Sequence, residues 1–313
     1  MVEEEVFKGS GENEELTPSE LPSNDDARRF DVKDSYLKMY SLEEQRQLRS
    51  FNMSLMALSS CEVMEDNKTI VVGCWDNRVY FYSIEYGRVL DTLNGHDDAV
   101  SCVKWKKNML FTASWDSTVK VWEMDFSTAR NGLPTVEFLG QLDHDDGVTC
   151  LDIDQDCVSM VTGTKDGQVC LWDLASYYSL ACTPVHSGSV NCCLLSQDKR
   201  RLFSCGEDNL IKVLDVETMT ELFTKDLQHQ ICCMKMLPGE SCNLLTGDSD
   251  GCLNLWDMDK GQVTQTLKAH SGAAKFACCA NLPEQEKSQA VTEMEQHLLK
   301  VTKERSYLRS ILE

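Results

Sequence analysis

Residues 111–122 read FTASWDSTVKVW, and this stretch decides the fold. The alternation of apolar and polar residues in TVKVW (118–122) predicts a β-strand, with Trp122 at its end and Trp115 in the turn before it. Two similar stretches follow later in the chain, 164-TKDGQVCLWD-173 and 249-SDGCLNLWD-257. We therefore expect a repeated strand–turn–strand unit, in which Trp122 has counterparts in Trp172 and Trp256, whereas Trp115 is shared only with Trp75.

The unit recurs at a regular spacing. Histidines stand at intervals of roughly 40–48 residues, at positions 96, 144, 186, 229 and 270. Aspartates keep the same spacing at positions 76, 116, 166, 208 and 250, and six residues after each stands Tyr82, Trp122, Trp172, Leu214 or Trp256. Such a period, with four short strands per unit, is typical of β-propeller blades. The sequence resembles the WD40 family, so we predict an all-β WD40 β-propeller with five complete repeats.

The resemblance implies a hydrogen-bond relay inside each repeat. In the WD40 pattern, a histidine before the first strand meets a Ser or Thr of the second strand, an aspartate of the next turn holds that histidine, and a tryptophan of the third strand completes the relay. A buried, linked network of this kind fixes the geometry of a blade, so we predict a structural role and no catalytic one. Two sets match in full: His96, Ser114, Asp116 and Trp122, and then His144, Thr164, Asp166 and Trp172. A third set, His229, Asp250 and Trp256, has Asp248 in place of the hydroxyl, and the set of His186 and Asp208 is poorer still, with Gly206 and Leu214.

Both ends of the repeat array are irregular. We expect residues 1–30 to be a disordered acidic tail, residues 31–281 the propeller, and residues 282–313 an amphipathic or coiled-coil-like helix. A partial unit around Asp34 and Tyr40 precedes the first full repeat, and His270 opens a last unit. The partial unit at 34–48 could pair with a strand near 274–280 and give six blades. Otherwise the chain is a truncated seven-bladed ring.

Composition narrows the class of partner. The net charge of −21 disfavours nucleic acid and anionic membranes as partners. The 16 cysteines include no C-x-x-C pair, and no secretory signal opens the chain, so we expect reduced, buried thiols and a cytoplasmic protein. The chain has no run of apolar residues long enough to cross a membrane, and no P-loop, H-E-x-x-H or G-x-S-x-G motif. We predict no enzyme activity, no cofactor and no metal site.

A closer resemblance rests on 37-LKMYSLEEQRQ-47, 75-WDNRVYFYSIEYGR-88, 95-GHDDAVS-101 and 113-ASWDSTVKVW-122. These runs are similar to the propeller of the BEACH–WD40 adaptors that act in sphingomyelinase activation. In that family the propeller follows a PH-like and a BEACH domain, for which residues 1–30 leave no room, so we expect only the partner-binding part. The resemblance implies an adaptor that links the cytoplasmic tail of a receptor to sphingolipid or trafficking signals.

The binding site is predicted at the loops of one propeller face, because a rigid scaffold displays its functional residues on loops. The turn residue before each repeated aspartate should lie on this face, and in two repeats it is a tryptophan, Trp75 or Trp115. The residues predicted beside them are Lys165, Asp97, Asp98, Asp145 and Asp146. Such a surface suits a peptide with basic and apolar residues. The alternatives are that the two indoles only pack on each other, or that the active feature is self-association through residues 284–313.

Overall fold

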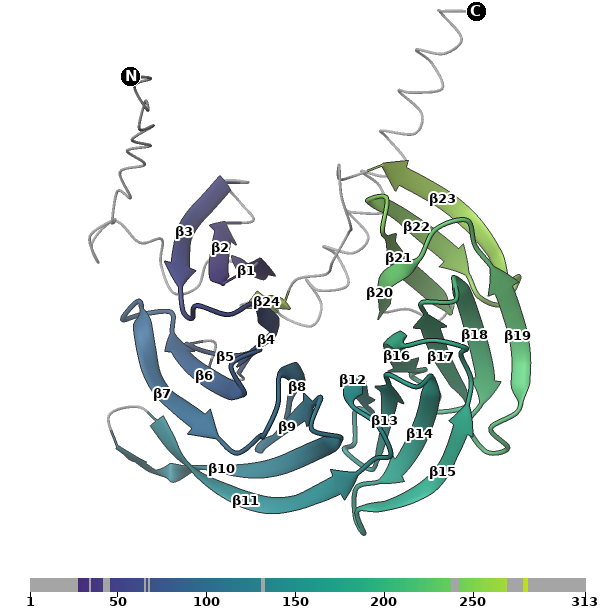
Figure 1. Cartoon of the computed structure of the whole chain (residues 1–313). Helices are drawn as coiled ribbons and strands as arrows, with labels where there is room; N and C mark the ends of the chain where they lie inside the picture. The colour runs from purple at the N-terminus through teal and green to yellow at the C-terminus, as the bar shows by residue number, and fades with distance from the viewer. Residues whose placement is uncertain are drawn as a thin grey trace, which may run out of the picture.

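The computed structural model describes residues 28–33, 35–41, 46–64, 66, 68–130, 133–237, 242–268 and 278–280. Within them the chain forms 24 β-strands, arranged as six four-stranded antiparallel sheets that stand around a common centre (Figure 1). The fold is therefore the all-β propeller that the repeats predict. The acidic tail before Arg28 and the helix predicted at 282–313 lie outside the described residues.

Five blades follow one another along the chain, each made of four consecutive strands. Blade 1 holds β4 (Leu58–Val63), β5 (Thr69–Cys74), β6 (Arg78–Ser83) and β7 (Arg88–Asn94). Blade 2 holds β8 (Val100–Lys106), β9 (Met109–Ser114), β10 (Thr118–Arg130) and β11 (Leu133–Asp143). Blade 3 holds β12 (Val148–Ile153), β13 (Ser159–Thr164), β14 (Gln168–Asp173) and β15 (Tyr178–Pro184). Blade 4 holds β16 (Val190–Leu195), β17 (Arg201–Gly206), β18 (Leu210–Asp215) and β19 (Glu221–Asp226). Blade 5 holds β20 (Ile231–Met236), β21 (Asn243–Asp248), β22 (Cys252–Asp257) and β23 (Gln262–Lys268).

The sixth sheet, called here the closing blade, combines both ends of the array. Its strand order is β24 (Cys278–Ala280), β1 (Arg28–Lys33), β2 (Tyr36–Ser41) and β3 (Arg46–Asn52). The N-terminal partial unit and a strand near 274–280 share this sheet, as the six-blade alternative predicted, but the strand that pairs with β24 is β1, in the register Phe30↔Cys278, and not a strand of residues 34–48. β1 begins at Arg28, so the expectation of a disordered tail over residues 1–30 is wrong for its last three residues. The polar and acidic residues around this strand obscure its alternation in the sequence.

Apolar contacts between successive sheets form the core. Phe81 of blade 1, for example, packs with Val103 and Trp105 of blade 2, and equivalent clusters join the closing blade to blade 1 and blades 2 to 5 to one another. The cluster on the far face of blade 5 holds only residues of that blade: Leu237, Leu245, Leu253 and Leu255. In Figure 1 blade 5 and the closing blade stand apart, so the described blades form an open arc.

The turn that follows the second strand of each blade has one shape throughout. The residue after the repeated aspartate has a positive φ of 70° at Asn77, 67° at Ser117, 88° at Gly167, 62° at Asn209 and 82° at Gly251. Glycine and asparagine tolerate this left-handed conformation better than other residues. The turn therefore presents the residue before the aspartate at the same place in every blade.

Hydrogen bonds along the innermost strands link neighbouring blades. The side chain of Ser101 donates to the carbonyl of Val148, and Asn191 donates to the carbonyl of Ile231 at 2.8 Å. Thr149 makes the equivalent bond from blade 3 to blade 4. A small polar side chain at the second position of the innermost strand thus ties each of these blades to the next one.

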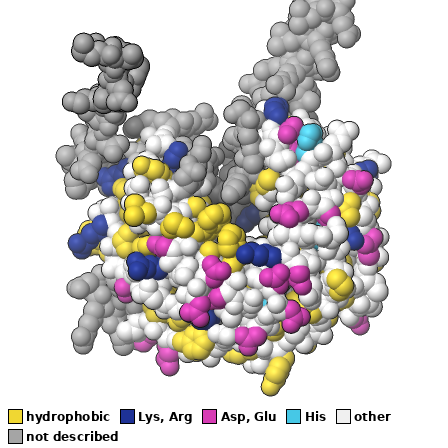
Figure 2. Space-filling view, viewed as in Figure 1, with side chains coloured by type: hydrophobic (Ala, Val, Ile, Leu, Met, Phe, Trp, Pro, Cys, Tyr) yellow, Lys and Arg dark blue, Asp and Glu magenta, His cyan; other side chains and the backbone are white. Residues whose placement is uncertain are grey.

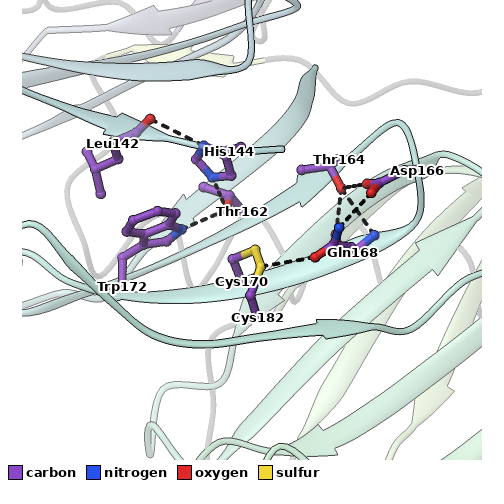
Figure 3. Close-up of a disulfide and its surroundings, with 9 residues drawn as sticks. All are labelled: Leu142, His144, Thr162, Thr164, Asp166, Gln168, Cys170, Trp172 and Cys182. Carbon is purple, nitrogen blue, oxygen red and sulfur yellow. Dashed lines mark hydrogen bonds between the residues drawn. A yellow bond between two sulfur atoms is a disulfide. The ribbon is translucent and has the colours of Figure 1, made fainter. Parts of the chain in front are cut away.

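Cys170 and Cys182 face each other across β14 and β15 and form a disulfide, with their Cα atoms 4.1 Å apart (Figure 3). The expectation of reduced cysteines throughout is wrong for this pair, because the register sets the two residues directly opposite. Cys74, Cys102, Cys150 and Cys193 are among the cysteines that keep free thiols. Burial raises the pKa of Cys102 to about 11 and that of Cys193 well above its usual value, so these thiols pack as small apolar groups.

Candidate functional site

The relay of blade 2 is built around a hydroxyl that the sequence pattern misplaced. His96 Nδ1 lies 2.7 Å from Asp116 Oδ2, and its Nε2 lies 2.7 Å from Thr112 Oγ1. The indole of Trp122 donates to the same Thr112 Oγ1 at 3.0 Å. Ser114, the predicted hydroxyl, instead donates to the carbonyl of Asp98. Residues 112 and 114 share a face of the strand and are both fully buried, but only Thr112 bonds to the indole.

Blade 3 departs further from the predicted relay (Figure 3). His144 Nε2 lies 2.8 Å from Thr162 Oγ1, to which Trp172 donates at 2.9 Å. Thr164 and Asp166, predicted as partners of His144, bond to each other, and Asp166 also accepts from Gln168. Burial lowers the pKa of His144 to about 4, so its ring is neutral near pH 7.

The sequence predicted a less complete relay in blade 4 than in blade 5, and the structure shows the opposite. His186 meets Asp208 at 2.9 Å and Ser204 at 2.9 Å, so this relay forms although Leu214 replaces the tryptophan. In blade 5, His229 lies 3.6 Å from Asp250 and both side chains are about half exposed. The residue that aligns with the relay histidines there is Leu227, because His229 stands two residues closer to the strand. Trp256 still donates to Thr246 at 3.0 Å.

The five turn residues that the sequence predicted at one face occupy equivalent backbone positions. Each donates its amide N–H to the loop before the innermost strand of its blade. The pairs are Trp75 to Ala57, Trp115 to Ala99, Lys165 to Gly147, Glu207 to Ser189 and Ser249 to Gln230, at 2.8–3.0 Å. The repeat therefore sets the positions of these residues, while their side chains are free to differ.

Trp75 and Trp115 lie side by side across the boundary of blades 1 and 2. Their ring centroids are 5.1 Å apart and their planes are tilted by 46°. Trp75 is 42% exposed and Trp115 is partly buried. Lys165 of blade 3 places its Nζ 3.6 Å from the centroid of the Trp115 ring. The two indoles thus pack on each other, as the alternative interpretation predicted, and Trp75 still presents a large apolar surface to solvent.

Two apolar residues beside Trp75 were missed by the sequence interpretation. Leu55 is 100% exposed and Met56 is 48% exposed, in the loop that Trp75 contacts through its bond to Ala57. Blades 2 and 3 carry two consecutive aspartates at the equivalent loop positions. An alignment of the loops could therefore have revealed that blade 1 has apolar residues where these blades have charged ones. We call Leu55, Met56, Trp75 and Trp115 the indole patch.

Carboxylates stand in the loops next to the indole patch. Asp97, Asp98 and Asp145 are exposed and Asp146 is partly exposed. Asp98 and Asp146 accept the amide N–H of the residue that follows them, and the carbonyl of Asp97 accepts from Asn77. On the face drawn in Figure 2, hydrophobic side chains gather over one side of the ring, with basic side chains beside them and acidic ones over the neighbouring blades.

Among the described residues, no three His, Cys, Asp or Glu side chains are grouped as metal ligands would be. The described part of the chain also contains no helix that could cross a membrane. The loops of the indole patch and their neighbours present exposed apolar side chains and carboxylates, which can bind a partner through apolar contact and charge.

The comparisons with known proteins agree with this architecture. Residues 178–215 and 221–257 match the family model of the WD domain, G-beta repeat, and residues 59–183 match that of the N-terminal domain of nucleolar protein 10-like proteins. One chain of a crystal structure of the mitotic checkpoint complex superposes with a TM-score of 0.68 at 17% identity, covering 82% of this chain and 78% of that one. The protein is thus an all-β propeller, and its residues 178–215 and 221–257 match WD40 repeats.

Two relatives are similar to most of the length of this chain. Autophagy-related protein 16 of Arabidopsis thaliana is 26% identical over 264 residues, which are 79% of this chain and 48% of that protein. BEACH domain-containing protein B of Arabidopsis thaliana is 24% identical over 240 residues, which are 71% of this chain and 9% of that protein. The chain therefore matches less than half of the length of either relative. An identity this low does not confirm the closer resemblance to the BEACH–WD40 adaptors.

Proposed function

We propose that this protein is a non-catalytic interaction scaffold that binds a segment of a partner protein on the indole patch. The observation that carries the proposal is the exposure of three apolar side chains, Leu55, Met56 and Trp75, on two propeller loops that a hydrogen bond from Trp75 N–H to the Ala57 carbonyl joins. Exposed apolar groups gathered in one place are a hallmark of interaction sites, and aromatic anchors supply much of the binding energy.

Charge indicates the chemistry of the partner. The net charge is −21, and Asp97, Asp98 and Asp145 are exposed carboxylates on the loops next to the patch. A segment with an apolar anchor and nearby lysine or arginine complements this surface. Acidic surfaces also accelerate the encounter with basic partners, an effect that salt weakens.

The experiment uses short random peptides displayed on phage and selected against the full chain. The affinity of a selected peptide is then measured for the wild type, Trp75→Ala and Leu55→Ser. We expect each change to weaken binding by about 10-fold or more, because each removes a central apolar contact. Tyr178→Ala is the matched control: Tyr178 is 75% exposed but lies on the outer strand β15 of blade 3. Affinities that are equal for all four proteins would remove the patch as the binding site.

The identity of the partner is a further part of the proposal. The resemblance to the factor associated with neutral sphingomyelinase activation supports a receptor's cytoplasmic tail, with a trafficking partner of the BEACH type as the alternative, and a cytoplasmic location. A synthetic peptide of a candidate tail that binds the wild type but not Trp75→Ala would identify it. Self-association through residues 284–313 falls outside the described residues, and sedimentation of the chain with and without this segment tests it.

A further inference from the structure

The contact between Lys165 and Trp115 has a consequence for the kind of side chain that this face accepts. Trp75 reaches Trp115 from blade 1 and Lys165 reaches it from blade 3, on the other side of blade 2. The Trp115 indole therefore contacts both a second indole and an ammonium group. At 3.6 Å from the ring centroid, the Lys165 amine is well within the range of a cation–π contact.

The path of the Lys165 side chain is built into the fold. At Gly147 an added Cβ would lie 3.2 Å from Lys165 Cδ and 3.1 Å from the carbonyl oxygen of Trp115. The equivalent residue of blade 2 is Ala99, so the glycine leaves room for the lysine stem where another blade carries a methyl group. The backbone of Lys165 is fixed at the same time by its bond to Gly147. The amine therefore reaches Trp115 along a defined route.

The ammonium group itself is held weakly. Among the ion pairs and hydrogen bonds between described residues, none involves Lys165 Nζ, and the ring of Trp115 is the contact that it makes. A cation–π contact at a partly exposed site contributes on the order of 0.5–1 kcal/mol, which thermal motion and a competing cation can overcome. The Lys165 amine thus contacts the Trp115 ring through a weak interaction that a competing cation can replace.

We propose that the face of Trp115 under Lys165 is a binding site for an alkylammonium or guanidinium group, and that Lys165 is its resident ligand. A lysine or arginine side chain of a partner enters by displacing Lys165, and the displaced amine moves toward solvent. This inference deepens the proposed function, on which it rests, by naming the group that the patch recognises beside its apolar anchor. Lys165 then sets specificity, since only a cation that outcompetes it gains the site.

The test needs no partner protein. The α-blocked amides of lysine and arginine are titrated into the wild type and Lys165→Met, with the α-blocked amide of norleucine as the uncharged control. The emission of Trp115 is obtained as the difference from matched Trp115→Phe variants. We expect both basic amides to change this emission in Lys165→Met at a concentration roughly 2- to 5-fold lower than in the wild type, the factor that an exposed cation–π contact supplies. Lys165→Gln should respond like Lys165→Met, which separates loss of charge from a local packing change.

Two results would overturn the proposal. The first is that the basic amides change the emission of Trp115 at the same concentration in the wild type and in both Lys165 variants. The second is that the norleucine amide changes this emission at the same concentration as the basic amides. These results are distinguishable from failure of the proposed function. Loss of peptide binding in Trp75→Ala reports on the apolar anchor, whereas the amide titration reports on the ring of Trp115 alone.

Discussion

The relay hydroxyls show how a single polar atom can organise a blade. Thr112 Oγ1 contacts both His96 Nε2 and Trp122 Nε1, and Thr162 does the same for His144 and Trp172. All three groups are buried, so removing the shared oxygen leaves two ring nitrogens without a partner.

Thr112→Val is expected to lower the free energy of unfolding by about 1–3 kcal/mol, because the isosteric methyl group accepts no hydrogen bond. Urea denaturation measures this change. Thr183→Val, at a partly exposed position of β15, serves as the control and should change stability by less than about 0.5 kcal/mol. Equal effects of the two changes would contradict the role of Thr112.

His144 gives the protein a pH-dependent stability. Burial lowers its folded-state pKa to about 4, whereas an unfolded histidine titrates near 6.5. As the pH falls from 6.5 toward 4, the unfolded chain binds a proton that the folded protein does not. This group therefore lowers stability by up to about 1.4 kcal/mol per pH unit in that window and has no such effect above it. In His144→Gln, the free energy of unfolding should depend less steeply on pH between 6.5 and 4, because the variant lacks the group that binds a proton only in the unfolded chain. An unchanged slope would refute this assignment.

The sequence predicted that Trp122, Trp172 and Trp256 are equivalent, because a residue type that recurs at a regular spacing can be recognised from the sequence alone. It misassigned Ser114 and Thr164, since residues two apart on a strand share a face and spacing alone does not tell which one bonds to the indole. It also misassigned His229, because the spacing of histidines tolerates a shift of two residues that the strand register does not. Leu55 and Met56 were missed because their exposure depends on the loop that carries them.

At the scale of strands, the blades pack so closely that some positions accept no side chain. Gly163 of β13 faces blade 4, and a Cβ there would lie 2.6 Å from Val190 Cγ1 and 2.8 Å from Cys150 Sγ. The inter-blade bond from Thr149 to Val190 adds a second link at the same boundary. The sequence indicated repeated strands but not this contact, which depends on how two sheets meet.

Gly163→Ala is expected to destabilise the protein by about 1–3 kcal/mol, because the added methyl group overpacks the boundary of blades 3 and 4. Gly188→Ala is the control, since its Cβ would lie 3.3 Å from Glu207 Cβ, near ordinary contact distance. Urea denaturation of both variants measures the difference. A Gly163→Ala protein as stable as the control would contradict the packing described.

At the scale of the whole molecule, blades 1 to 5 carry either a tryptophan or a polar residue at the same position of the turn after the second strand. Blades 1 and 2 present Trp75 and Trp115, while blades 3, 4 and 5 present Lys165, Glu207 and Ser249 at equivalent positions. The frame is the same in each blade, so this difference has no structural requirement behind it. It gives the propeller one apolar sector on an otherwise polar face, and the proposed function rests on that sector.

Hydrogen–deuterium exchange of the full chain, with and without a selected peptide, tests the central claim most directly. We predict that the bound peptide slows exchange in the loops that contain Leu55, Trp75 and Trp115, and leaves the outer strands β15, β19 and β23 unchanged. Slowed exchange confined to those outer strands, with none in the three loops, would contradict the claim that the indole patch is where this propeller binds its partner.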